Sequence, residues 1–423
     1  MLGGSFKRDR LTTGLLLLAS LLSFVLSKEA GSEWADGSCV MVSGATGFVA
    51  GHVVEILLKK GYTVHGTVRS LKSEDKIAFL KEFNETLPGT LKLFEASLTG
   101  KDPFNKAISG CAGVLHIASA VMSPHIPPAE FVDIAVSGTL SALEAAKKSK
   151  TVKRVVVTSS VASIYPTKSK IASGEAYGID DWNEMATQDY CTYAYSKTQA
   201  EKATLEWLKK EKKKPFQYSS IHFPAAFGPQ QNARVTSSQI MPQLVLANVY
   251  PVLMPMGVNV IDVRDVARAH VHALESEKAD GRYIVALDPS VSKYSLKDVS
   301  NTFQQLYPDH PVPYLELPVG LSKLIALLDK RVDQCMLDAW KRAIPGYDGS
   351  RLVKELGFEY KHTNLTETFR DTAESFFKHG VATRGKGSML VTLLPFSPVL
   401  LLTLFYAVRL LCFSSGKPKT KTS

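Results

Sequence analysis

Short runs of apolar and β-branched residues alternate with longer stretches of helical periodicity from Cys39 onward. The expected strands are 39–43, 62–68, 91–96, 113–118, 153–158 and 217–223, and the expected helices include 48–60, 73–83, 130–149 and 191–213. The order βαβαβ, met twice, predicts an α/β fold with a Rossmann-like doubly wound parallel sheet. Such a sheet binds a dinucleotide at the carboxyl ends of its strands.

The pattern changes after about residue 224, where loops rich in Pro and Met separate short elements. We therefore expect a nucleotide-binding domain over 38–223. Residues 224–380 should form mainly a smaller C-terminal substrate lobe, interleaved with the first domain. The run 241–260 is rich in Pro, Met, Leu and Val, which fits the wall of an apolar pocket and also fits ordinary core packing.

Two uncharged apolar segments lie outside this pattern. Residues 11–27 follow a cluster of basic residues, which is the layout of a cleaved signal peptide or of a retained signal anchor, so we assign 1–30 to that role. Residues 387–408 are long enough to cross ~30 Å of hydrocarbon. They predict a transmembrane helix over 387–409, followed by a basic tail over 410–423.

The charges around these segments predict a protein of the endoplasmic-reticulum membrane, in contact with membrane lipid. The basic residues before residue 11 should stay cytosolic, which would carry the body of the chain into the lumen. The last residues, 419–423, resemble the Lys-x-Lys-x-x retrieval signal, which is read from the cytosol. Asn84 and Asn364 begin glycosylation sequons that would be usable in the lumen. In the rival arrangement, the C-terminal helix alone anchors a cytosolic body.

The formal net charge of +10 is concentrated at the two ends of the chain. Residues 1–30 supply +2 and residues 381–423 supply +6, so residues 31–380 carry only +2. A body this close to neutrality offers no basic face for phosphate contacts, and we exclude a nucleic-acid partner. The five cysteines are scattered, so we expect neither a metal site nor a disulfide framework.

The first turn of the expected sheet reads SGATGFVAG over 43–51, between an apolar strand and a helix. Its small residues let the backbone approach a pyrophosphate, which the free N–H groups of the helix N-terminus then stabilise. The spacing differs from the Gly-x-Gly-x-x-Gly fingerprint, and a purely structural tight turn is the alternative. The candidate cofactor-binding residues in this turn are Gly44, Ala45, Thr46, Gly47, Phe48 and Val49.

Arg69 stands at the end of the second strand, where an acidic residue would hold the ribose hydroxyls of NAD. A guanidinium can instead pair with the 2′-phosphate of NADP. Arg69 therefore predicts NADP(H) as the cofactor, with Lys72 as a second cation beside it. The alternative is an arginine that only faces solvent.

Tyr193 and Lys197 are four residues apart in an expected helix and therefore share one face. A nearby ammonium favours the ionised form of a phenol, which makes the tyrosine an effective acid and base. Tyr195 is the competing tyrosine, but it cannot share that face. The strand 153–158 runs into hydroxyl residues, and a serine there can hydrogen-bond a substrate carbonyl while the tyrosine protonates it. A turn or helix cap is the alternative role for such a serine.

Together these motifs resemble the extended short-chain dehydrogenase/reductases of the NAD-dependent epimerase/dehydratase superfamily. The closest branch contains dihydroflavonol reductases, cinnamoyl-CoA reductases and 3β-hydroxysteroid dehydrogenases. The matching stretches are 42–70, 113–119, 135–148, 154–160, 193–203, 227–229 and 261–270. The resemblance implies a Ser-Tyr-Lys catalytic set made of Ser160, with Ser159 as the alternate, Tyr193 and Lys197. It also implies cofactor contacts by Tyr193, Lys197, Leu98 and Ala118.

Three positions depart from these relatives. Ser97 replaces an Asp that contacts the adenine, and His222 precedes Phe223-Pro224 where relatives usually have Asn before that proline. Residues 190–192 lack the longer signature of cinnamoyl-CoA reductases. We therefore expect looser adenine binding, altered loop contacts near the nicotinamide, and no CoA thioester as substrate.

These observations predict an NADPH-dependent carbonyl reductase or alcohol dehydrogenase that acts on a small-molecule ketone or aldehyde. A sterol, a lipid and a dihydroflavonol-like compound are the candidate substrates. One alternative is a nucleotide-sugar epimerase or dehydratase, which Arg69 disfavours because such enzymes usually prefer NAD. The other is a non-catalytic nucleotide-binding membrane protein, which the intact set of Ser160, Tyr193 and Lys197 disfavours.

Overall fold

The computed structural model describes most of the chain between Trp34 and Gly385. The described residues are 34, 37–120, 126–166, 170, 175–249, 252–320, 322, 335 and 344–385. Both apolar segments of the sequence, 11–27 and 387–409, lie outside them, and so does the basic tail. Within the described ranges, no helix is both long and apolar enough to cross a membrane.

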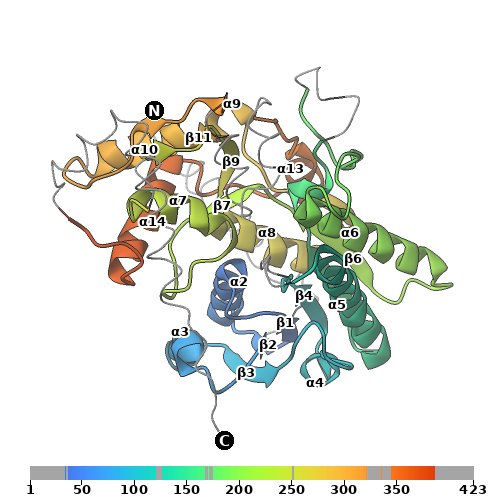
Figure 1. Ribbon diagram of the computed structural model, residues 1–423. Helices are drawn as coiled ribbons and strands as arrows, with labels where there is room; N and C mark the ends of the chain where they lie inside the picture. The colour runs from blue at the N-terminus through green and yellow to red at the C-terminus, as the bar shows by residue number, and fades with distance from the viewer. Residues whose placement is uncertain are drawn as a thin grey trace, which may run out of the picture.

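The centre of the molecule is a seven-stranded parallel sheet (Figure 1). Its strands, in the order in which they lie, are β10 (Gly281–Ile284), β6 (Gln217–His222), β5 (Arg154–Thr158), β4 (Gly113–His116), β1 (Cys39–Val42), β2 (Thr63–Val68) and β3 (Thr90–Glu95). The strand order reverses between β1 and β4, and the crevice at such a reversal is where doubly wound sheets bind nucleotides.

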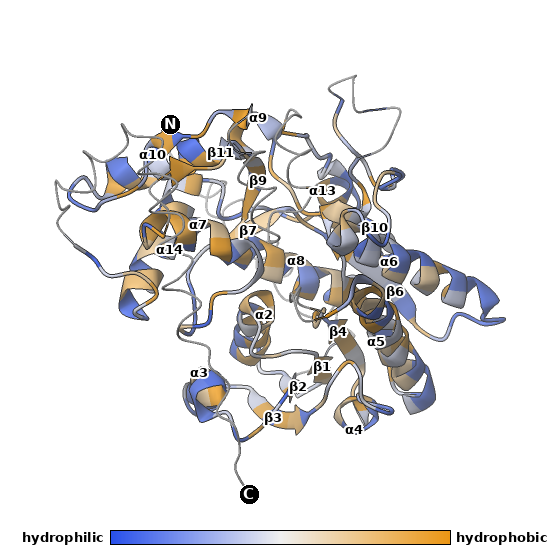
Figure 2. Ribbon diagram, viewed as in Figure 1, coloured by the Kyte–Doolittle hydropathy of each residue, from blue (hydrophilic) through white to orange (hydrophobic). Residues whose placement is uncertain are grey.

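Helices cover both faces of this sheet. On one face, α2 (Phe48–Lys59) packs against α8 (Val263–Glu275), and α3 (Glu74–Thr86) lies beside α2 and β3. On the other face, α5 (Pro128–Ser149) packs along α6 (Thr192–Lys210), with the short α4 (Asn105–Ile108) next to α5. Figure 2 shows hydrophobic residues gathered on the central strands and polar residues at the outer ends of α5 and α6. Burial on both faces explains why the strands are apolar runs in the sequence.

The second lobe is built around a three-stranded sheet in the order β11-β9-β7. Its strands are β7 (Ala225–Phe227), β9 (Gly257–Asp262) and β11 (Lys293–Ser295), and β8 (Val252–Leu253) pairs with β12 (Leu315–Glu316). Its described helices are α7 (Ile240–Leu246), α9 (Pro289–Ser292), α10 (Leu296–Leu306), α13 (Ser350–Leu356) and α14 (Leu365–Lys378), with the 3-10 turn η2 (Ser237–Gln239). Another 3-10 turn, η1 (Val161–Ser163), follows β5 in the first domain and packs against α6. The chain leaves this lobe to add α8 and β10 to the first domain.

The six predicted strands all lie in the large sheet, with ends that differ from the prediction by no more than two residues. The seventh strand, β10, escaped the prediction because its four residues, Gly281–Ile284, carry too short a pattern.

The expectation that the cysteines form no disulfide framework was wrong. Cys39 is bonded to Cys111, and Cys191 is bonded to Cys335, across 72 and 144 residues of sequence. Cys39 opens β1 and Cys111 precedes β4, so the pairing of these neighbouring strands brings the two sulfurs together. Spacing along the chain cannot reveal contacts of this kind, because the sheet creates them.

Candidate active site

The turn between β1 and α2 is closely packed against the ends of two neighbouring strands. Gly44 has a positive φ of 66°, and a Cβ there would lie 3.1 Å from the Cβ of Ala118. The Gly44 amide donates to Thr67 Oγ1 at 3.0 Å, and Ser43 Oγ accepts from the amides of Ile117 and Ala118 at 2.8 and 2.9 Å. Only glycine fits this left-handed, crowded position without strain.

The N-terminus of α2 faces the crevice at this turn. Its N-cap, Gly47, has no side chain to cap the first N–H groups of the helix. These groups carry partial positive charge and are free to bind an anion. The turn therefore suits the pyrophosphate of a dinucleotide, and the assignment of Gly44 to Val49 to that role stays a prediction.

A second feature is a hollow at the end of β2. Three cationic residues from separate segments line it: Arg69 after β2, Lys76 on α3 and Arg234 from the loop after β7. Ser70 and Ser73 add hydroxyl groups. None of the described residues that line the hollow is acidic, so it fits a phosphate group.

The sequence identified only part of this hollow. Lys72, the second cation that we expected, is exposed and does not line it, whereas Lys76 does. Lys76 follows the N-cap Ser73 by three residues, so a helix register drawn from Ser73 would have placed it in the first turn. Arg234 lies 165 residues beyond Arg69, and no local pattern could have found it.

The structure brings Ser160, Tyr193 and Lys197 together at the carboxyl end of β5. The side chains of Tyr193 and Ser160 form a hydrogen bond. Lys197 Nζ lies 6.0 Å from the centre of the Tyr193 ring and donates to the Thr158 carbonyl at 3.5 Å. Ser159, the alternate serine, instead donates to Glu201 at 3.0 Å.

Local geometry holds this group in place. Ser160 is the N-cap of η1, and its Oγ accepts from the Ala162 amide at 3.1 Å. Cys191 is the N-cap of α6 in a left-handed conformation with a φ of 58°. Its disulfide to Cys335 fastens the chain two residues before Tyr193. Unusual backbone conformations often mark positions where a functional side chain must be aimed.

Burial changes the acidity of both groups. About 37% of Tyr193 is exposed; burial of the remainder raises the pKa of Tyr193, although the Ser160 hydrogen bond opposes the shift. Burial lowers the pKa of Lys197 to about 8, although the charge of Glu201 opposes the change. Burial, and then the charge of Lys197, lowers the pKa of His116 to about 3, so this imidazole is neutral at physiological pH.

Glu201, one turn beyond Lys197, is the centre of a buried polar network. Its carboxylate accepts hydrogen bonds from Ser159, Ser163, Ser220 and Arg282 and lies 2.9 Å from His222 Nε2. Burial by itself would raise the pKa of Glu201, but His222 and Arg282 hold it at about 2. The carboxylate is therefore ionised under all physiological conditions.

This network explains one departure from the expected family pattern. His222 is fully buried, and its Nδ1 lies 3.2 Å from the Ser160 carbonyl oxygen. It therefore connects Glu201 to the backbone of Ser160 rather than facing a loop contact. The sequence singled out His222 but contained no sign of its partner, which lies on another element.

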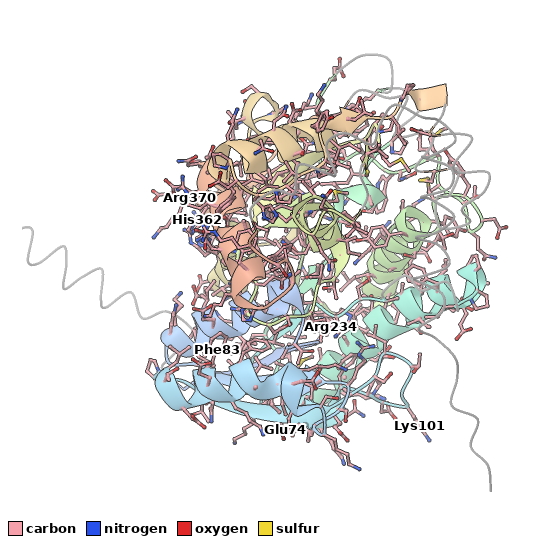
Figure 3. The ribbon with its side chains drawn as sticks, turned by 60° about the vertical axis from the view of Figure 1, so that its left-hand side comes forward. Glu74, Phe83, Lys101, Arg234, His362 and Arg370 are labelled. Carbon is pink, nitrogen blue, oxygen red and sulfur yellow. A yellow bond between two sulfur atoms is a disulfide. The ribbon has the colours of Figure 1, made fainter. Side chains whose placement is uncertain are left out.

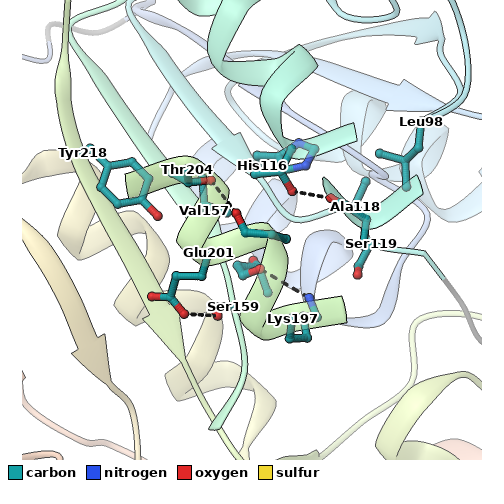
Figure 4. A pocket seen from close by; sticks show the side chains of 14 residues that line it. Leu98, His116, Ala118, Ser119, Val157, Ser159, Lys197, Glu201, Thr204 and Tyr218 are labelled. Atoms are coloured by element: carbon teal, nitrogen blue, oxygen red, sulfur yellow. Dashed lines mark hydrogen bonds between the residues drawn. The ribbon is translucent and has the colours of Figure 1, made fainter. Parts of the chain in front are cut away.

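A cavity opens beside Lys197, between α6, α5 and the ends of β4 and β5. Figure 4 shows Lys197 and Ser159 at this cavity, with Leu98, Ala118 and Ser119 across from them. Leu98 and Ala118, the candidate cofactor contacts, therefore line the same cavity. The cavity, the β1–α2 turn and the cationic hollow all lie along the carboxyl edge of the sheet.

These features together define a dinucleotide-binding oxidoreductase of the Rossmann-like type. Residues 40–286 match the NAD dependent epimerase/dehydratase family, and the chain belongs to that family. The match spans the large sheet through β10.

Several curated relatives and solved structures that this chain resembles are reductases. A cinnamoyl-CoA reductase of Medicago truncatula is 31% identical over 348 residues, which cover 80% of this chain and 95% of that protein. The tetraketide alpha-pyrone reductase 2 of Arabidopsis thaliana is 30% identical and covers 81% of this chain and 98% of its own. The crystal structure of Gre2 from Candida albicans in complex with NADPH has a TM-score of 0.64, with 29% identity, and covers 81% of this chain and 99% of its own.

The protein is therefore an oxidoreductase that acts on carbonyl or alcohol groups of small molecules and uses NADP(H). The described residues fit that cofactor at two independent places. The N-terminus of α2, which has no side-chain cap, suits the pyrophosphate, and the hollow at Arg69 offers positive charge that suits a 2′-phosphate.

Proposed function

We propose that this enzyme reduces a ketone or aldehyde with NADPH, using Ser160, Tyr193 and Lys197 as its catalytic set. The hydrogen bond between Tyr193 and Ser160, with Lys197 one helical turn away, carries the proposal. The two hydroxyls can both donate hydrogen bonds to one substrate carbonyl oxygen. They lie at the same edge of the sheet as the β1–α2 turn.

Each residue has a distinct part in this reaction. The reduced nicotinamide supplies hydride to the carbonyl carbon when the cofactor is bound. Tyr193 donates its proton to the carbonyl oxygen as negative charge develops there, and Ser160 donates a hydrogen bond to the same oxygen. Lys197 stabilises the tyrosinate that remains and contacts the nicotinamide ribose.

The remaining cofactor contacts follow the same edge of the sheet. In this proposal, residues 44–49 hold the pyrophosphate and Arg69 holds the 2′-phosphate. Leu98 and Ala118 line the cavity beside Lys197, where they would contact the bound cofactor.

Consumption of NADPH in the presence of a mixed substrate panel tests this function. The panel holds an aliphatic aldehyde, a sterol ketone, a dihydroflavonol, a CoA thioester and a nucleotide sugar. We expect NADPH oxidation with at least one ketone or aldehyde, and none with the CoA thioester. Conversion of the nucleotide sugar without net NADPH consumption would instead identify an epimerase or dehydratase, and inactivity with every compound would favour a non-catalytic role.

We also propose that the catalytic body lies in the lumen of the endoplasmic reticulum, with the transmembrane helix over 387–409 and a cytosolic tail. Two disulfides within the described residues fit an oxidising compartment. Asn84 and Asn364, the two sequon asparagines, are exposed. These observations are independent of the charge pattern at the ends of the chain.

Intact microsomes test this placement. We expect the body to resist added protease until detergent is present, and to lose mass when treated with an endoglycosidase. Alkylation without reductant should leave Cys39, Cys111, Cys191 and Cys335 unmodified. Complete digestion of the body in intact microsomes, or four freely alkylated cysteines, would favour a cytosolic body.

A further inference from the structure

The loop 228–236 crosses from the second lobe to the nucleotide-binding domain. Its base is attached to α14, because the Gly228 amide donates to Thr372 Oγ1 at 2.9 Å and the Gln230 amide donates to Ser375 Oγ at 2.8 Å. The middle of the loop is attached to α2. Gln231 Nε2 donates to Glu55 at 2.8 Å, and His52 Nε2 lies 3.0 Å from the Pro229 carbonyl oxygen.

A local turn in this loop places Arg234 at the cationic hollow. Asn232 Oδ1 accepts from the Arg234 amide at 2.9 Å, which forms a local turn just before the arginine side chain. Arg234 then lines the hollow with Arg69 and Lys76. Figure 3 shows Arg234 at the junction between the two lobes. The anchors on α2 and α14 hold the loop at this position.

The hollow gathers positive charge that the protein leaves unbalanced. Burial lowers the pKa of Arg234, and the neighbouring charge of Arg69 lowers it further. The described lining of the hollow contains no carboxylate to offset this repulsion. Two guanidinium groups that face one hollow suit a doubly charged phosphate, which can accept bidentate hydrogen bonds from both.

We propose that Arg234 is a ligand of the adenosine 2′-phosphate, so that NADP(H), unlike NAD(H), joins the loop 228–236 of the second lobe to the nucleotide-binding domain. The inference rests on NADP(H) as the cofactor and adds a specificity residue from the other lobe. The 2′-phosphate would lie between Arg69 and Lys76 on one side and Arg234 on the other, and its charge would offset their repulsion.

Calorimetry with two cofactor fragments tests the role of Arg234. Adenosine 2′,5′-bisphosphate carries the 2′-phosphate, whereas adenosine 5′-monophosphate lacks it. We expect Arg234→Ala and Arg234→Gln each to lower the affinity for the bisphosphate about tenfold and to leave the monophosphate affinity unchanged. Arg69→Ala should show the same selective loss, and Lys72→Ala, which removes an exposed cation outside the hollow, should show none.

Limited trypsin digestion at saturating ligand provides a second readout, which reports the position of the loop. Cleavage after Arg234, identified by the mass of the fragments, should slow in the presence of the bisphosphate but not of the monophosphate. Arg234 variants that fold normally by circular dichroism and keep wild-type affinity for the bisphosphate would overturn the proposal while leaving the NADP(H) preference intact. A wild-type protein that binds both fragments equally would overturn the proposal together with the 2′-phosphate site.

Discussion

Tyr193→Phe is expected to lower kcat by about a hundredfold to ten-thousandfold while NADPH affinity stays near the wild-type value. The substitution removes the hydroxyl that hydrogen-bonds Ser160 and would protonate the carbonyl oxygen, and it keeps the ring that packs near Lys197. Single-turnover rates with an active carbonyl substrate, combined with a titration of NADPH fluorescence, separate chemistry from cofactor binding.

Tyr195→Phe is the matched control for this substitution. It removes the same atom from the same helix two residues later, on a different face. Tyr195→Phe should keep near-normal turnover. If Tyr193→Phe remained active and Tyr195→Phe did not, the proton donor would be Tyr195, and the hydrogen bond between Tyr193 and Ser160 would have only a structural role.

Lys197→Ala is expected to reduce both kcat and NADPH affinity, each by about tenfold or more, because one ammonium supports the tyrosinate and the cofactor ribose. The pH profile gives a sharper test. Burial lowers the pKa of Lys197 to about 8, so its charge is present below that pH and is lost above it. We therefore expect kcat/KM for reduction to be level in neutral solution and to fall above about pH 8.

Lys197→Arg tests whether loss of the positive charge at residue 197 causes the alkaline decline. A guanidinium stays protonated throughout this range, so the fall in kcat/KM should move to higher pH. Lys209→Ala, on the exposed end of α6, is the control and should change neither kcat nor the profile. A profile that is identical in the wild type and in Lys197→Arg would show that another group controls the alkaline decline.

Tyr193, Lys197 and Glu201 follow one another at four-residue intervals along α6, so the site continues inward as a single stripe of polar side chains. Glu201 holds Ser159 and Ser163 by hydrogen bonds and lies beside His222. His222 in turn reaches the Ser160 carbonyl. The network therefore positions Ser160 and its neighbouring serines as well as Lys197. A buried carboxylate needs several hydrogen-bond donors, and here these donors come from the elements that carry the site.

The sequence by itself determined those parts of the protein that depend on neighbouring residues. Runs of apolar residues defined six strands, since a strand buried on both faces needs no partner to be recognised. The tight turn at Gly44 and Gly47 was readable because one strand and one helix flank it directly. The shared face of Tyr193 and Lys197 follows from helical spacing alone.

Only the tertiary structure decided which distant residues meet. Arg234 lies at the hollow with Arg69 because the loop 228–236 of the second lobe is hydrogen-bonded to α2. The pairing of β1 with β4 brings Cys39 and Cys111 together. The contact of His222 with Glu201 likewise joins β6 to α6. Local periodicity specifies helices and strands, but contacts across 72 or 144 residues arise only when the packing of those elements closes the intervening chain.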